Sequence, residues 1–231
     1  MKNIKDIFFD LDNTLWDFEK NSEMTLLEII NEFNLINKGV NNAQDFIKRY
    51  KKHNERLWTL YRDNKITKEK LRGERFLLTL KEYGLNDPKL ANDFGLAYIK
   101  KSPLKKILFP FTIQVLSYLK SKYNLHIITN GFEEVQHVKL QSSNLTHYFK
   151  NIITSEEVGV KKPNKKIFQY ALKISDADPN QSIMIGDDLI SDIKGAAKLK
   201  IKTIFFNPKK IQYTKTEDYE ISCLSELINL L

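Results

Sequence analysis

Short apolar runs that end in polar or turn-forming residues constrain the fold of this chain more than any other feature. The first run, Ile4–Phe9, is rich in β-branched and aromatic residues, ends in Ile7-Phe8-Phe9 and stops at Asp10. Short, mainly apolar runs of this kind are typical of strands buried in a parallel sheet. Similar runs recur at Leu125–Thr129, Asn151–Thr154, Ser182–Ile185 and Lys202–Phe206. Because helix-like stretches follow the first three of these, the sequence predicts an α/β fold with a doubly wound parallel sheet.

Residues 17–104 break this alternation of strands and helices. They contain no convincing strand, whereas helices are expected at Thr67–Tyr83 and from Pro88 to about Lys101. A helical block placed between the first strand and the rest of the sheet predicts an inserted cap domain. The Rossmann-like core would then consist of residues 1–16 and 105–231.

The composition fits one folded core with an insertion. Hydrophobic residues make up 42% of the 231 residues, which is enough to fill such a core. No apolar run approaches the roughly 18 to 20 residues of a membrane span, so we expect a cytoplasmic protein. The single cysteine, Cys223, cannot form an internal disulfide. The formal net charge of +8 is not concentrated in one segment, and it suits a small anionic substrate as well as nucleic acid.

Two aspartates follow the first strand. Asp10 and Asp12 are separated by one residue, and because strand side chains alternate, both can face one bound group. Asp10 could attack a phosphorus atom while Asp12 protonates the leaving oxygen and later activates a water molecule. Thr14 lies in the next turn, where its hydroxyl could bond to the backbone and hold the loop. Alone, such a pair of aspartates equally describes a plain turn.

The second polar segment, Thr129-Asn130-Gly131, joins a strand to a helix. Its hydroxyl, amide and backbone N–H groups could together cradle phosphate oxygens at the start of that helix. The alternative for this segment is an ordinary helix cap. Its position after a predicted strand favours the phosphate interpretation.

A pair of lysines precedes Pro163, directly before another predicted helix. A lysine fixed there could neutralise both the nucleophile and the transferring phosphoryl group. We prefer Lys162 to Lys161, since the residue beside a proline is conformationally the more restricted. The alternative for either lysine is an ordinary solvated side chain.

An acidic cluster follows the run Ser182–Ile185. Asp187 and Asp188 come directly after Gly186, and Asp192 lies a few residues further on. Carboxylates at a strand end are suitable hard-oxygen ligands for Mg²⁺. Asp188 is better interpreted as a cap at the start of the following helix.

These four signals occur in one chain order, each at the end of a predicted strand, and together they resemble the haloacid dehalogenase superfamily. DLDNT, ITNG, the lysine before Pro163 and GDDLISD match the four motifs of that family in order and spacing. The match covers the whole predicted core. The helical block resembles the cap that the family places after its first motif.

The resemblance implies a nucleophilic Asp10, a general acid and base at Asp12, and phosphate binding by Thr129 and Lys162, with Asn130 in the same cradle. The dehalogenase branch lacks the second aspartate, so Asp12 favours phosphoryl chemistry. The resemblance also implies a Mg²⁺ cofactor held by Asp10, the backbone carbonyl of Asp12 and Asp187, with Thr14 and Asp192 in support.

Longer strings at 128–132, 155–160 and 162–168 resemble the pyrimidine 5′-nucleotidases. They imply a phosphomonoester hydrolase that acts on nucleoside monophosphates. We expect a small phosphorylated metabolite as partner, no nucleic acid or membrane, and a monomer or homodimer. Two alternatives stay open: a sugar phosphate or acyl sugar phosphatase with the same chemistry, and a non-catalytic binding protein on the same fold.

Overall fold

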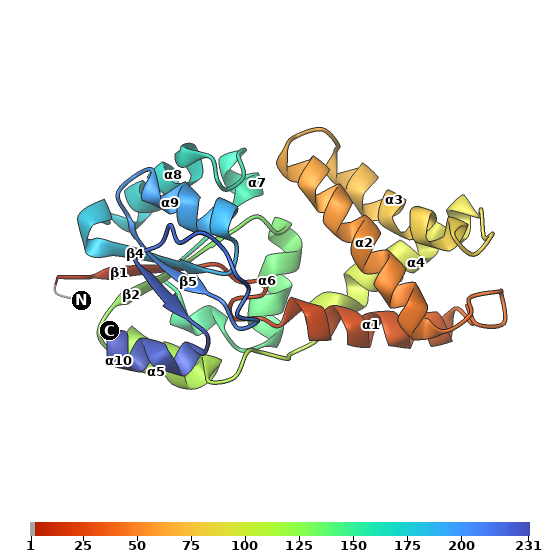
Figure 1. Cartoon of the computed structure of the whole chain (residues 1–231), viewed down its shortest axis with the longest axis horizontal. Helices are drawn as coiled ribbons and strands as arrows, with labels where there is room; N and C mark the ends of the chain where they lie inside the picture. The colour runs from red at the N-terminus through yellow and green to blue at the C-terminus, as the bar shows by residue number, and fades with distance from the viewer. Residues whose placement is uncertain (1–2) are drawn as a thin grey trace. The chain divides into compact units, whose positions relative to one another are not determined.

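The computed structural model describes residues 3–231 and divides them into two compact units (Figure 1). One unit joins the segment through Phe18 to Lys106–Leu231, and the other is Glu19–Lys105. Within the described residues, every strand lies in the first unit, which we call the core unit, and the second, helical unit contains helices alone. No helix in residues 3–231 is long and apolar enough to cross a membrane.

The core unit is built on a six-stranded sheet with the order β3-β2-β1-β4-β5-β6, in which every neighbouring pair is parallel. This confirms the predicted doubly wound parallel sheet. The strands are β1 (Asp6–Phe9), β2 (Asn124–Thr129), β3 (Asn151–Thr154), β4 (Ser182–Gly186), β5 (Lys202–Phe206) and β6 (Tyr219–Ile221).

Strand β1 is buried on both faces, which explains why Ile7, Phe8 and Phe9 are apolar in succession. Ile7 and Phe9 point into the apolar core that α5 (Thr112–Lys120) and α10 (Leu227–Leu230) cover. Phe8 points to the opposite face, into the core beneath α8 (Lys165–Ser175) and α9 (Gly195–Ala197). Figure 1 shows these two helix pairs on opposite sides of the sheet.

The register of the sheet brings the ends of the central strands together. Phe9 of β1 lies opposite Ile127 of β2 and Ile185 of β4. The backbone N–H of Asp10 extends the ladder by donating to the carbonyl of Ile185 over 2.9 Å. The loops that follow β1, β2 and β4 therefore meet at one edge of the sheet, where ligands bind in folds of this kind.

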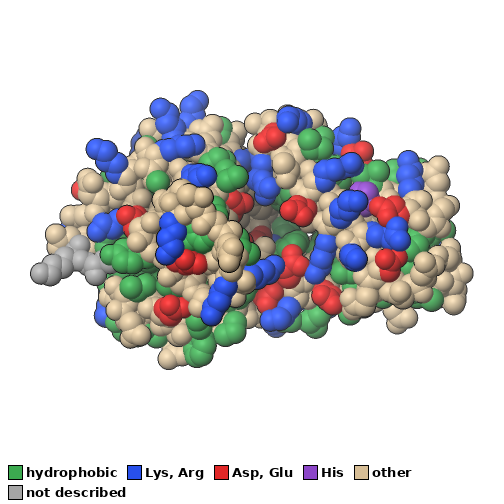
Figure 2. All heavy atoms as spheres, in the orientation of Figure 1, with side chains coloured by type: hydrophobic (Ala, Val, Ile, Leu, Met, Phe, Trp, Pro, Cys, Tyr) green, Lys and Arg blue, Asp and Glu red, His purple; other side chains and the backbone are tan. Residues whose placement is uncertain are grey.

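The remaining helices of the core unit are short. They are α6 (Glu133–Ser142), α7 (Ser155–Val158), the π-helical segment η4 (Leu189–Lys194), and the 3₁₀ turns η2 (Thr146–Tyr148), η3 (Pro179–Gln181) and η5 (Leu224–Glu226). Charged side chains of both signs are interspersed over the visible face of this unit, with no single basic patch (Figure 2).

The helical unit packs around its own aromatic core. Its elements are α1 (Phe18–Glu32), α2 (Ala43–Arg62), α3 (Lys68–Lys81), α4 (Pro88–Lys101) and the 3₁₀ turn η1 (Ser102–Leu104). The rings of Tyr50, Phe76 and Phe94 are all buried and lie within this core, with Tyr50 and Phe76 stacked at 5.1 Å between centroids. Thr67 and Asp87 cap α3 and α4 by accepting hydrogen bonds from backbone N–H groups. Both predicted helices of this region are thus present.

Candidate active site

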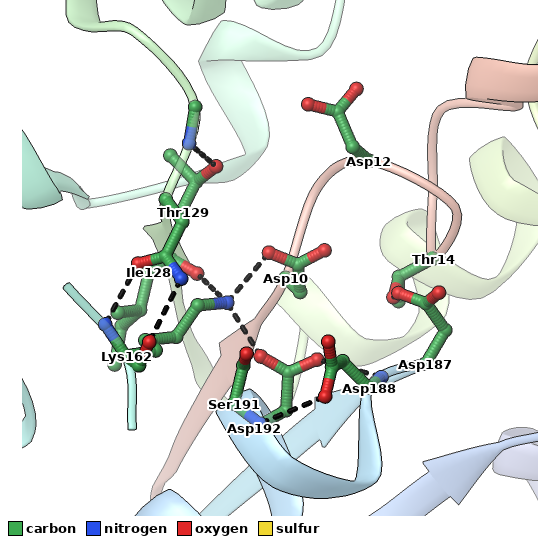
Figure 3. Close-up of polar contacts among 12 residues, drawn as sticks. Asp10, Asp12, Thr14, Ile128, Thr129, Lys162, Asp187, Asp188, Ser191 and Asp192 are labelled. Carbon is green, nitrogen blue, oxygen red and sulfur yellow. Dashed lines mark hydrogen bonds and ion pairs between the residues drawn. The ribbon is translucent and has the colours of Figure 1, made fainter. Parts of the chain in front are cut away.

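Lys162 is the centre of the polar cluster at the carboxyl edge of the sheet (Figure 3). Its Nζ donates to Oδ1 of Asp10 and to Oδ1 of Asp192, each over 2.6 Å. A third hydrogen bond of 2.7 Å goes to the carbonyl oxygen of Ile128. Only 2% of the side chain is exposed. The ammonium therefore has all three donors used and links the loop after β1 to the segment after β4.

Asn130 fixes the backbone that carries this lysine. Its Oδ1 accepts from the backbone N–H of Lys162 over 2.7 Å, and its Nδ2 donates to the carbonyl oxygen of Lys162 over 3.0 Å. Both ends of the Asn130 amide thus contact Lys162, and because Nδ2 carries a second N–H, phosphate binding by this side chain stays a prediction. The side chain joins the second and third motifs because it can accept and donate at once.

Thr129 ends β2 and shapes the turn into α6. Its Oγ1 accepts from the backbone N–H of Gly131 over 3.0 Å, and its side chain is buried. A Cβ atom on Gly131 would lie 1.5 Å from Nε2 of Gln136, so only glycine fits there beside that side chain. The Thr-Asn-Gly segment is therefore a tight turn held by its own side chains and packed against α6.

Three carboxylates lie close together beside the ammonium of Lys162. One oxygen each from Asp10, Asp187 and Asp192 lie within 4.8 Å of one another. Thr14 donates its hydroxyl to Oδ1 of Asp187 over 3.3 Å, rather than to the backbone of its own loop as we expected. Three carboxylates face one ammonium, and hard oxygen donors with an excess of negative charge suit a divalent cation such as Mg²⁺.

Burial and crowding shift the titration of this cluster. Burial raises the pKa of Asp10 to about 7, with Lys162 opposing the shift and Asp192 adding to it. The pKa of Asp187 is raised first by burial and then by its carboxylate neighbours Asp10 and Asp192. Burial alone would lower the pKa of Lys162, but those same two carboxylates outweigh it and raise the value. The lysine is therefore a permanent cation between them.

Asp12 has different partners from Asp10. Both oxygens of its carboxylate accept from Nζ of Lys139, over 2.6 and 2.8 Å, and Oδ2 also accepts from Nε2 of Gln136 over 2.8 Å. Figure 3 shows the carboxylate of Asp12 directed away from the group formed by Asp10 and Lys162. The sequence reasoning missed Gln136 and Lys139. A signal was present, because both are polar residues on the buried face of α6.

Asp188 caps η4, as predicted. Its Oδ1 accepts from the backbone N–H groups of Ile190 and Ser191 over 2.8 and 2.9 Å. Asp192 lies on the same turn, where its Oδ2 accepts from the backbone N–H of Asp188 over 3.1 Å. The cap thus aims Asp192 back at the sheet edge and towards Lys162.

Aromatic side chains of the kind that can stack on a nucleobase occur in both units. Trp16 is fully buried in the core unit, and the ammonium of Lys139 lies 4.3 Å from the centroid of its ring. Phe18 is half-buried and packs against the same core. Trp58 and Tyr61 lie on α2 of the helical unit, with ring centroids 5.6 Å apart.

Comparison with known proteins identifies the family of this chain. The sequence matches the family described as haloacid dehalogenase-like hydrolase over residues 4–200. The chain belongs to the haloacid dehalogenase-like hydrolase family. It is therefore an enzyme, and the sheet edge that carries Asp10 and Lys162 is its candidate active site.

Several relatives of this hydrolase match along almost their whole length. Pyrimidine 5′-nucleotidase YjjG of Escherichia coli is 34% identical over 97% of this chain and 96% of its own. A glyceraldehyde 3-phosphate phosphatase of Pyrococcus furiosus is 31% identical over 100% of this chain and 94% of its own. The solved structure of the HAD-hydrolase YfnB of Bacillus subtilis, bound to magnesium, superimposes with a TM-score of 0.89 at 29% identity, covering 99% of each chain.

Proposed function

We propose that this hydrolase cleaves phosphate monoesters by forming a phosphoryl bond to Asp10. The proposal depends most on the contact of 2.6 Å between Nζ of Lys162 and Oδ1 of Asp10. This contact places a buried cation against the carboxylate that would attack phosphorus. A transferring phosphoryl group brings negative charge to that carboxylate. The fixed ammonium offsets this charge without reorganisation.

The same cluster supports a bound Mg²⁺ ion. Asp10 and Asp187 would supply carboxylate oxygens and Asp12 its backbone carbonyl, with Asp192 close by in support. Thr14 orients Asp187 through its hydroxyl. Magnesium normally uses one or two carboxylates plus water and phosphate oxygens. When bound, it would neutralise charge on the phosphoryl oxygens and on the carboxylates around them.

The chain's own side chains supply the remaining chemistry. An oxygen of Asp10 attacks phosphorus, and the bond from phosphorus to the ester oxygen breaks as the new bond forms. Asp12 gives a proton to the departing oxygen, which leaves as an alcohol. Asp12 then takes a proton from a water molecule that attacks phosphorus, and this second displacement releases inorganic phosphate and restores Asp10.

We propose pyrimidine nucleoside 5′-monophosphates as the substrates. The relatives named pyrimidine 5′-nucleotidase, YjjG of E. coli and PynA of Streptococcus pneumoniae, match this chain along at least 94% of their own length. In this proposal Glu19–Lys105 acts as a cap that selects the substrate. Trp58 is half-buried there and supplies an aromatic ring of the kind that stacks on a nucleobase, while the buried Tyr61 packs against it.

Sugar phosphates and small phosphorylated aldehydes form the second candidate substrate class. Relatives named glyceraldehyde 3-phosphate phosphatase match at a similar identity, 31% for that of P. furiosus. The catalytic residues are the same under both candidates. The choice between them depends on the helical unit.

Steady-state kinetics over a panel of phosphomonoesters with Mg²⁺ tests both parts of the proposal. We expect uridine and thymidine monophosphates to give the highest kcat/KM. If they are not turned over while glyceraldehyde 3-phosphate is, the nucleotidase assignment fails but the phosphatase assignment stands. An Asp10→Asn variant, assayed beside the wild type, should be inactive while keeping its circular dichroism spectrum. Activity retained by this variant would contradict the covalent mechanism.

A further inference from the structure

Lys139 is a buried cation that the proposed mechanism does not use. It lies on α6, and 5% of its side chain is exposed. Its ammonium contacts both oxygens of Asp12 and lies over the rings of Trp16 and Phe18, at 4.3 and 5.7 Å from their centroids. The aromatic faces and the carboxylate together hold the ammonium at one place.

Gln136 supports the same carboxylate from the preceding turn of α6. Its Nε2 donates to Oδ2 of Asp12 over 2.8 Å, and its side chain passes so close to Gly131 that no Cβ atom fits there. Gln136 therefore connects Asp12 to the turn that carries Thr129. The position of the carboxylate is tied to that of the proposed phosphate cradle.

The ion pair between Lys139 and Asp12 is only partly buried. The side chain of Asp12 is 25% exposed, compared with 5% for Lys139. The lysine contacts both oxygens of Asp12 from α6, while part of the carboxylate side chain stays accessible to solvent.

We propose that Lys139 is a positioning residue that, with Gln136, holds the carboxylate of Asp12 where it exchanges protons with the leaving alcohol and the attacking water. The proposal rests on the proposed function. Asp12 lies in the loop after β1, and the contacts from Lys139 and Gln136 restrict the rotation of its side chain. Fixing both of its oxygens from one helix removes that freedom before the reaction, which is the advantage of a preorganised catalytic group.

This role predicts a dependence on the leaving group. An alkoxide leaves phosphorus only when a proton reaches its oxygen, so alkyl phosphates need a well-placed Asp12. The p-nitrophenolate ion is stable without a proton and leaves unaided. Because kcat/KM covers the steps up to departure of the leaving group, it reports proton donation without the later attack of water.

The test compares kcat/KM of Lys139→Met for p-nitrophenyl phosphate and for the best alkyl phosphate found with the wild type. We expect a loss of about 30-fold or more for the alkyl ester and less than about threefold for the aryl ester. Lys139→Arg should recover most of the lost activity, because a guanidinium also donates to both carboxylate oxygens. Lys198→Met removes an exposed lysine of the core unit and controls for the change in charge.

The same measurements in an Asp12→Asn background complete the test. There, Lys139→Met should have no further effect on the alkyl-to-aryl ratio, because Lys139 acts through Asp12. Equal losses for both esters, or an undiminished effect in the Asp12→Asn background, would overturn the proposal. If Lys139→Met does not fold, Lys139→Gln is measured instead, and its ratio of kcat/KM for the alkyl ester to that for the aryl ester is compared with the wild type. A wild type that hydrolyses no phosphomonoester would instead refute the proposed function itself.

Discussion

The ammonium of Lys162 lies 2.6 Å from Oδ1 of Asp192, and the two side chains are only 2% and 1% exposed. Neither charge has access to water, so each depends on the other for its stabilisation. The same ammonium also contacts Asp10 at 2.6 Å. One buried lysine therefore serves the fold and the proposed chemistry at the same time.

Lys162→Met should damage both functions. Losing the cation leaves two buried carboxylates without their partner, and removing one member of such a pair typically costs about 3 to 5 kcal/mol. We expect a reduction of that size in the free energy of unfolding, measured with urea in buffer free of Mg²⁺, and no detectable turnover. Adding Asp192→Asn should recover part of the stability but none of the activity. Turnover within tenfold of the wild type would refute the assignment of Lys162.

Asp187→Asn should weaken the response to magnesium. The substitution removes one of the three carboxylates that lie within 4.8 Å of one another. We expect the Mg²⁺ concentration that gives half-maximal activity to rise by at least about tenfold, as measured by titrating the metal in the phosphatase assay. Thr14→Val removes only the hydroxyl that bonds Asp187 and should give a smaller shift in the same direction. An unchanged titration for Asp187→Asn would place the metal elsewhere.

Two glycine-to-alanine changes should have opposite effects on stability. At Gly186 a Cβ atom would lie 2.2 Å from Oδ2 of Asp192, so alanine should cost about 1 to 3 kcal/mol and move the carboxylate. At Gly73, within α3, no atom beyond the neighbouring backbone of the helix lies within 4 Å of the added carbon. Alanine there should add about 0.5 to 1 kcal/mol. Urea denaturation of both variants checks the pair, and a stabilising Gly186→Ala would contradict the close packing.

His126 should make the protein less stable in mild acid. Burial lowers the pKa of His126 below its usual value of 6.5, and Asp6 only partly opposes this. Its Nδ1 lies 3.1 Å from Nδ2 of Asn151 and 3.2 Å from Oγ of Ser175. Since the folded protein binds the proton less readily than the unfolded chain, the stability is complete above about pH 6.5 and falls as the pH decreases through that value.

Urea midpoints at pH 7.5 and 5.5 test this effect. His126→Gln should reduce the difference between the two midpoints, because the titrating ring is gone. His137→Gln, an exposed histidine on α6, should leave the difference unchanged. An equal difference in the wild type and in His126→Gln would show that other groups cause the acid sensitivity.

The fold was predictable where burial leaves a clear pattern in the sequence. Strand β1 faces two apolar cores, so Ile7, Phe8 and Phe9 are all apolar and stand out. Strand β6 was not predicted. It has three residues, and Tyr219 and Glu220 are exposed at the edge of the sheet, so no apolar run marks it. Its pairing with β5 depends on tertiary contacts rather than on local composition.

Part of the candidate site was predictable for a geometric reason. Parallel strands end at one edge, so residues such as Asp10 and Asp187 could be brought together from strand positions alone. Their catalytic and metal-binding roles stay predictions. The contact between Asp12 and Lys139 joins residues 127 positions apart and depends on how α6 packs against a loop. No local pattern in the sequence specifies that packing, and the partner of the Asn130 amide was missed for the same reason.

The position of β1 in the sheet has a consequence for synthesis on the ribosome. β1 pairs only with β2, which begins at Asn124, and with β4, which begins at Ser182. The contiguous helical unit Glu19–Lys105 has been translated in full before either neighbour exists. Asp10 precedes its partner Lys162 by 152 positions. A nascent chain thus carries its proposed nucleophile long before the residues that complete the candidate site, so we expect fragments from interrupted translation to lack hydrolase activity.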